Sequence, residues 1–169
     1  NEDQFEFLEI TNIGKQTVNL QGVQFNEGID YTFGDQNLEP GSSLVLTANR
    51  DAFVARYGEN NIKIAGEFKG SLSNSGETLK LSDQFGNLLQ EFNYNNNWYA
   101  ESAGGGRSLV IVEDTVNNES LSDPGNWRPS QFLGGSPGSM EDKLPMIRIS
   151  EIHYNPRKLN DSEIEAGFK

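Results

Sequence analysis

Few side chains in this 169-residue chain are suited to acid–base or metal chemistry. The chain has no cysteine and a single histidine, His153, in the run EIHYNP. Without a thiol there is no disulfide, no cysteine nucleophile and no zinc–thiolate site. A Ser-His-Asp triad would have to use His153, and a zinc site would need mostly carboxylates, which is uncommon for zinc. The residue types therefore argue against an enzyme, and we expect no catalytic residue.

Two other patterns that can mark an active site are equally weak. Glu113 and Asp114 are adjacent in sequence, but neighbours on a strand point to opposite faces and do not form an acid–base pair. The glycine-rich run SAGGGRS lacks the Gly-Lys-Ser/Thr ending of a phosphate-binding loop. We interpret it as a hairpin or a bulge.

Calcium is the one inorganic ligand for which the sequence offers candidate residues. The runs NEGID and FGDQN contain Glu27, Asp30 and Asp35, whose carboxylate oxygens are hard ligands of the kind that calcium prefers. The run VEDTVNNES offers a second set, and neither set has the spacing of an EF-hand. Turns also collect Asp and Asn for backbone reasons. We therefore name Glu27, Asp30 and Asp35 as calcium candidates and expect no other cofactor.

The charge balance bears on the partners of the protein. Lys and Arg total 13 against 25 Asp and Glu, which gives a formal net charge of −12. An acidic surface without a basic patch repels phosphate backbones, so we expect no nucleic acid as a partner. No run approaches the roughly 18 consecutive apolar residues of a membrane-spanning helix, so we expect no membrane span.

Short apolar or alternating runs recur along the chain and are separated by turn residues. Seven of them stand out: FEFLEIT, VNLQGVQF, YTF, SSLVLTA, ETLKLSD, LLQEFNY and SLVIVE. Short strands at this spacing are typical of an antiparallel sandwich or barrel. We expect positive φ angles at turns or bulges that contain Gly22, Gly28, Gly70, Gly76 and Gly86.

One run, NRDAFVARYG, predicts a single short helix. Asn49 can cap its start and Gly58 can end it. Phe53, Val54 and Tyr57 then share one face, which we expect to pack over the edge of the sandwich.

Six segments, in this order, resemble those of the lamin-tail domain: EFLEITN, LQGVQFNEGIDYTF, LEPGSSLVLTANRDAFVARYG, GEFKGSLSNSGETLKLSDQFGNLL, YNNNWYAESAGGGRSL and NWRPSQFLGGSPG. The resemblance runs almost from end to end. It implies an all-β, immunoglobulin-like β-sandwich with one short helix. It also implies a non-catalytic protein-interaction or spacer module of an exported or cell-surface bacterial multidomain protein, in an extracellular, periplasmic or surface location.

The C-terminal run MIRISEIHYNP resembles the strand with which bacterial members of this family begin. The resemblance therefore predicts a lamin-tail domain at 1–138 without its own first strand, a linker at 139–145, and the first strand and loop of a following tandem repeat at 146–169. The apolar members of this interaction strand are Ile147, Ile149, Ile152 and Tyr154.

An open sheet edge pairs readily with any suitable strand. We expect the interaction strand to complete the sandwich in cis or in trans, the alternative being an unpaired tail. The linker spans at most roughly 25 Å when extended, and such short connections favour strand exchange between copies. The partners we expect are a protein, a neighbouring lamin-tail repeat or a second copy of the chain.

A second hypothesis is a ligand-binding domain, for carbohydrate or calcium, that accompanies a secreted hydrolase or kinase-like protein. An open groove lined by Trp98, Tyr99 or Trp127 would favour carbohydrate. We expect Trp98 and Trp127 to be core anchors instead, because a lean sandwich needs large buried side chains.

Overall fold

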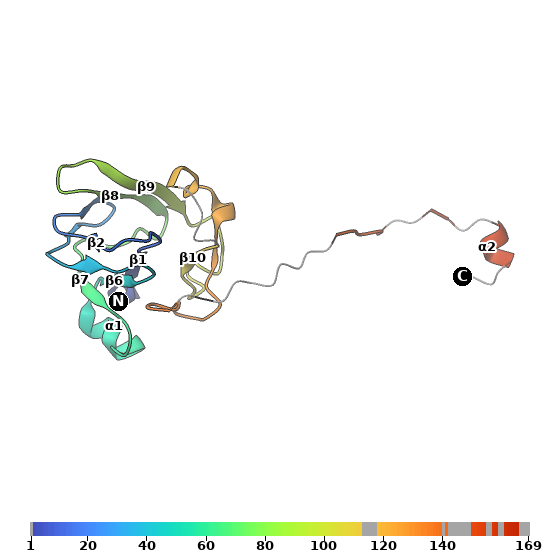
Figure 1. The fold of residues 1–169 in the computed structure, drawn as a ribbon. Coiled ribbons are helices and arrows are strands. Elements are labelled where there is room, and N and C mark those ends of the chain that lie inside the picture. Colours follow the sequence, from blue (N-terminus) through green and yellow to red (C-terminus); the bar gives the residue numbers. More distant parts are fainter. Residues whose placement is uncertain are drawn as a thin grey trace.

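The strands of the chain are short and form two main sheets that pack face to face (Figure 1). The computed structural model describes residues 2–112, 118–139, 141, 150–154, 157–158 and 161–165. The first main sheet has the strand order β1-β6-β7 and the second has the order β4-β3-β8-β9. The strands of the first sheet are β1 (Phe7–Thr11), β6 (Ser43–Thr47) and β7 (Ile64–Glu67). Those of the second sheet are β3 (Gln24–Glu27), β4 (Tyr31–Thr32), β8 (Gly76–Ser82) and β9 (Leu88–Asn95).

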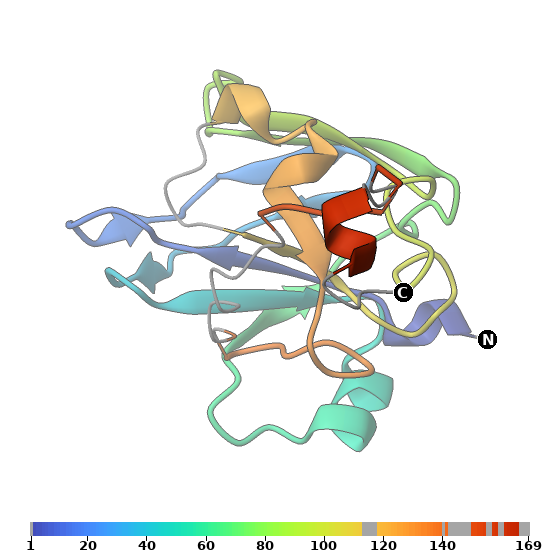
Figure 2. The same cartoon turned by 90° about the vertical axis from the view of Figure 1, so that its right-hand side faces the viewer.

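Two small sheets and several short helices accompany these layers. One small sheet pairs β2 (Val18–Asn19) with β5 (Asn37–Leu38), and the other pairs β10 (Leu109–Ile111) with β11 (Trp127–Pro129). The helices are α1 (Arg50–Tyr57), α2 (Asp161–Glu165) and the 3-10 turns η1 (Glu2–Phe5), η2 (Asn118–Ser120) and η3 (Pro124–Asn126). Figure 2 shows α1 on the outer side of the β1-β6-β7 sheet. None of the described helices is long and apolar enough to cross a membrane.

The core lies between the two main sheets because their strands turn alternate apolar side chains inward. Leu8 and Ile10 of β1 stand opposite Leu46 and Leu44 of β6, and all four contribute to the core. The fully buried members are Leu20, Val23, Phe25, Ile29, Phe33, Leu38, Leu44, Leu46, Phe68 and Leu79.

One strand pair in the first sheet is parallel, which the sequence did not predict. Val45 of β6 stands opposite Ile64 of β7 in a parallel register. A parallel pair needs a crossover connection, and α1 is the helix of that crossover. The helix has the predicted ends: the Asn49 side chain accepts a 2.9 Å hydrogen bond from the backbone N–H of Ala52, and Gly58 follows with a φ of 74°.

The all-β sandwich with a short packed helix is confirmed, and every one of the seven predicted runs contains a strand. Three strands were not predicted, namely β5, β7 and β11. Each of them lies in a run without clear alternation and forms only because a partner strand from elsewhere in the sequence lies beside it.

The positive φ angles predicted for five glycines are confirmed, with values from 74° to 102°. Gly76, at the start of β8, has the largest of these values. A Cβ atom at Gly76 would lie 2.3 Å from the carbonyl oxygen of Tyr94 on β9. This position therefore needs both the left-handed conformation and the absence of a side chain.

We predict that Gly76→Ala lowers the free energy of unfolding by about 3 kcal/mol, because backbone strain and overlap with β9 add together. The matched control is Gly86→Ala, at a φ of 84° with no atom within 4 Å of the added Cβ. There we expect a loss of about 1 kcal/mol from strain alone. Urea unfolding followed by circular dichroism measures both. Equal losses would contradict the close approach of β9 to Gly76.

Candidate interaction site

The outer edge of β1 has no strand beside it in the described part of the chain. The backbone N–H of Ala48 donates to Glu6 and that of Asn12 donates to Ser42, both at 3.0 Å, and the antiparallel register between β1 and β6 is continuous. Residues bonded to the neighbouring strand alternate with residues whose N–H and C=O point away. The backbone groups of Phe7, Glu9 and Thr11 therefore point away from β6, and no described residue bonds to them.

β10 has a similar open edge. The backbone N–H of Val112 donates to Asn126 and that of Ser130 donates to Ser108, at 2.9 and 2.8 Å. The alternation then turns the backbone groups of Leu109 and Ile111 away from β11, and no described residue bonds to these groups. In Figure 1, β10 lies beyond β1 on the side opposite to β6.

The closing segment, residues 130–139 and 141, connects these two edges through side chains. The hydroxyl of Tyr57 donates to the carbonyl oxygen of Gly134 at 2.6 Å. Gly135 lies against the ring of Phe7 and the side chain of Ser108, so that an added Cβ would meet them at 3.0 and 2.8 Å. The backbone N–H of Gly138 donates to the carboxylate of Glu9. The closing segment thus crosses from the start of β10 to the middle of β1.

A buried ion pair fixes the end of the closing segment. The Glu141 side chain is 1% exposed and accepts hydrogen bonds from the Arg128 guanidinium at 2.6 Å, the Gln131 backbone N–H at 2.9 Å and the Ser136 hydroxyl at 2.9 Å. Burial alone would raise the pKa of Glu141, but these donors together hold it below its ordinary value. The chain is therefore anchored to β11 at the residue from which the C-terminal part departs.

Apolar side chains cover both faces of the first sheet at this edge. Leu8 and Ile10 face the core. On the opposite face, the ring of Phe7 packs edge-on against Phe53 and Tyr57 of α1, with ring centroids 5.8 Å apart in both pairs. The open edge of β1 is thus bordered by apolar groups above and below the sheet.

The family comparison agrees with this architecture. A sequence model described as Lamin Tail Domain matches residues 1–96, from the N-terminal turn through β9. The chain belongs to the lamin tail domain family. No curated protein matches its sequence. The two packed sheets are thus an immunoglobulin-like sandwich, and β10, β11 and the closing segment follow the matched region of this lamin tail domain.

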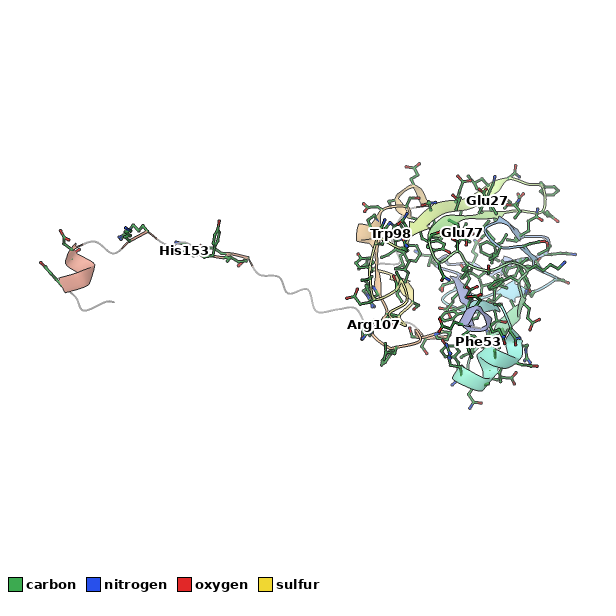
Figure 3. All side chains as sticks on the ribbon, turned by 180° about the vertical axis from the view of Figure 1, so that it is seen from behind. Glu27, Phe53, Glu77, Trp98, Arg107 and His153 are labelled. Carbon is green, nitrogen blue, oxygen red and sulfur yellow. The ribbon has the colours of Figure 1, made fainter. Side chains whose placement is uncertain are left out.

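The predicted interaction strand lies only partly in the described chain. Ile147 and Ile149 are outside the described residues. Ile152 and Tyr154 are 69% and 89% exposed, and residues 150–154 are in neither helix nor strand. Figure 3 shows His153 well apart from the sandwich and its labelled side chains. Completion of the lamin tail domain by this strand, and the predicted division of the chain at 138 and 145, remain predictions.

The aromatic residues considered for carbohydrate pack mainly on one another. Trp127 stacks on Phe92 with ring centroids 5.3 Å apart, and Trp98 lies 6.3 Å from Trp127. The indole N–H of Trp127 donates to the carbonyl oxygen of Leu121 at 2.7 Å, and the Tyr99 hydroxyl is 2.8 Å from the carbonyl oxygen of Trp127. Trp98, Tyr99 and Trp127 are half-buried, and this cluster joins β11 to β9.

The three calcium candidates are exposed and serve local contacts. The backbone of Asp30 pairs with that of Lys69 at 3.0 and 2.9 Å, and the Asp35 carboxylate accepts a 2.9 Å hydrogen bond from the Asn19 side-chain amide. Glu27 ends β3 with an exposed side chain. Among the described residues, no three Asp, Glu or His side chains form a group able to hold a metal ion. Glu27, Asp30 and Asp35 are therefore not brought together.

Sequence reasoning missed the polar contacts that build this site. Arg128 and Glu141 are 13 residues apart, and neither stands in a pattern that signals pairing. Glu9 lies 129 residues from Gly138, its hydrogen-bond donor. The only available signal was the sequence density of turn residues between Ser130 and Ser139, which favours a loop folded back on itself.

We predict that Arg128→Met lowers the free energy of unfolding by about 3 kcal/mol, because it leaves the Glu141 carboxylate buried without its cation. The matched control is Arg50→Met. Its ion pair with Glu59 has side chains 50% and 51% exposed, and we expect a loss below about 1 kcal/mol. Chemical denaturation gives both values. An equally small loss at Arg128 would contradict the anchoring role of the buried pair.

We predict a pH-dependent contribution from Glu9. Burial raises the pKa of Glu9 above its ordinary value of 4.5, although the Gly138 N–H lowers it in part. The folded state then binds a proton at Glu9 more tightly than the unfolded state does. The contribution of Glu9 to the free energy of unfolding is therefore lost as pH rises from 4.5 through the raised pKa. Glu9→Gln should therefore gain stability relative to the native chain over that pH range. A difference in unfolding free energy that is constant with pH would contradict the shift.

Proposed function

We propose that this lamin tail domain is a non-catalytic protein-interaction and spacer module of an exported or cell-surface bacterial multidomain protein. Its location would then be extracellular, periplasmic or on the cell surface. Membership of the family supports an interaction module of immunoglobulin-like fold. The open edge of β1 is the observation that carries the proposal for this chain.

A strand edge is a binding surface in its own right. Its unpaired N–H and C=O groups can form a ladder with an added strand, and the flanking side chains select the sequence of that strand. The edge of β1 presents the backbone groups of Phe7, Glu9 and Thr11. β1 pairs with β6 on its inner side and is bonded to the closing segment through the Glu9 carboxylate.

The pocket beside β6 gives less support to catalysis or ligand binding. It is lined by Ser42, Ser43, Asn61 and Lys63, with Gly41 and Gly138. Lys63 is its one ionisable lining residue, so this pocket lacks an acid–base pair. The half-buried aromatic cluster and the separated calcium candidates likewise supply no obvious ligand surface.

We predict that the chain captures a protein partner through the β1 edge. The bait is the full chain, exposed to envelope and secreted fractions of the organism that makes it. Thr11→Pro removes an outward N–H that β6 does not use, so proline is compatible with the fold at this edge. A specific partner should be retained by the native chain and by Thr11→Val, and lost with Thr11→Pro.

The same preparations are tested against a glycan array and by calcium titration calorimetry. Saturable binding of a glycan or of calcium, with no protein lost on Thr11→Pro, would overturn the interaction proposal in favour of the ligand-binding alternative. Circular dichroism and melting temperature check that both Thr11 variants are folded.

A further inference from the structure

The open edge of β1 is bordered by a second open edge. β10 lies on the side of β1 opposite to β6 (Figure 1), and Gly135 contacts both Phe7 of β1 and Ser108 at the start of β10. The backbone groups of Leu109 and Ile111 point away from β11 and have no bond to a described residue. A strand added to β1 would therefore have β10 on its other side.

A strand at this position would be bordered by apolar groups on both faces of the sheet. The core face carries Leu8 and Ile10, and the opposite face carries Phe7 with the rings of Phe53 and Tyr57 behind it. Strands covered on both faces need apolar side chains on both, unlike strands with one face in water. A strand that fills this edge must therefore be apolar on both faces.

The run MIRISEIHYN, residues 146–155, has apolar side chains for both faces of a strand. Successive side chains of a strand alternate between faces, so Ile147 and Ile149 would point to one face, and Ile152 and Tyr154 to the other. A single strand of this sequence would place two large apolar side chains on each side. In the structure of the single chain, Ile152 and Tyr154 are 69% and 89% exposed to solvent.

Charge does not oppose this pairing. Arg148 and Glu151 cancel within residues 146–155, so the run is formally neutral in a chain whose formal net charge is −12. The carboxylates of Glu6 and Glu9 already accept hydrogen bonds from the backbone N–H groups of Leu72 and Gly138. The run would therefore bring no further negative charge to β1.

We propose that residues 146–155 of a second copy of this chain add as a strand to the outer edge of β1. This rests on the proposed interaction function and names the partner for the β1 edge. Two copies then exchange strands reciprocally, and each sandwich is completed by the other chain.

The position of the residues after Glu141 favours a strand from a second copy over the chain's own residues 146–155. Glu141 is anchored to Arg128, and the described residues 150–154 lie away from their own sandwich (Figure 3). The connection through 142–145 spans at most roughly 18 Å. It ends in Leu144-Pro145, where the proline disfavours a helical conformation at Leu144.

Complementary variants of the full chain test this proposal. Thr11→Pro damages the acceptor edge, and the double variant Ile147→Asp/Ile149→Asp damages the donor strand. Thr11→Val is the matched control, since it keeps the outward N–H. Mass is measured by light scattering after size-exclusion chromatography over a range of concentrations.

We expect the native chain and Thr11→Val to have twice the mass of one chain. Each damaged variant should fall to the mass of one chain, with dimerisation weakened at least tenfold. An equimolar mixture of the two damaged variants should recover a dimer, because one variant retains a working donor strand and the other a working acceptor edge.

Three outcomes would overturn the proposal. A native chain that stays at the mass of one copy, with only its melting temperature lowered by the variants, means that the strand closes its own domain. Masses and melting temperatures that no variant changes mean that the run pairs with nothing at β1. A native dimer with no recovery in the mixture means a different interface. In each case, loss of a captured partner on Thr11→Pro would still support the proposed interaction function.

Discussion

The backbone groups of a strand inside a sandwich must find hydrogen-bond partners, and β1 meets this requirement along one edge only. Its inner edge forms a continuous antiparallel ladder with β6, and both of its faces are covered, by the core and by α1. In the described part of the chain, the outward backbone donors and acceptors of Phe7, Glu9 and Thr11 stay unpaired. An unpaired strand edge beside an apolar interior is a ready site for pairing with another strand.

The closing segment joins the two open edges without pairing with either of them. Tyr57 binds Gly134, Gly138 binds the Glu9 carboxylate, and Glu141 binds Arg128. Each contact uses a side chain on at least one side, so none occupies the outward backbone groups of β1 or β10. The small sheet is thereby held beside the first main sheet by side-chain contacts.

The sequence predicted features whose cause is local and missed those whose cause is distant. The cap at Asn49 and the left-handed glycines follow from one or two residues and their immediate backbone, and they are confirmed. The parallel strand β7 depends on β6 across a helix, and the Glu141 anchor depends on a fold that brings Arg128 to it. Of the candidate site, the family resemblance predicted an open sheet edge and the apolar run near Ile152. It did not predict that the outer strand would be β1, because the neighbours of a strand are defined only in space.

An exposed strand edge risks indiscriminate aggregation, and the charge of this chain bears on how the risk is limited. A formal net charge of −12 makes copies repel one another, and the carboxylate of Glu9 stands on β1 itself. Acidic side chains at an edge discourage pairing with most sequences. Residues 146–155 are formally neutral, because Arg148 and Glu151 cancel, and they are apolar on both faces, so this run adds no negative charge to the edge while gaining burial. Open backbone groups then give affinity, and two-sided apolar character gives the choice of partner.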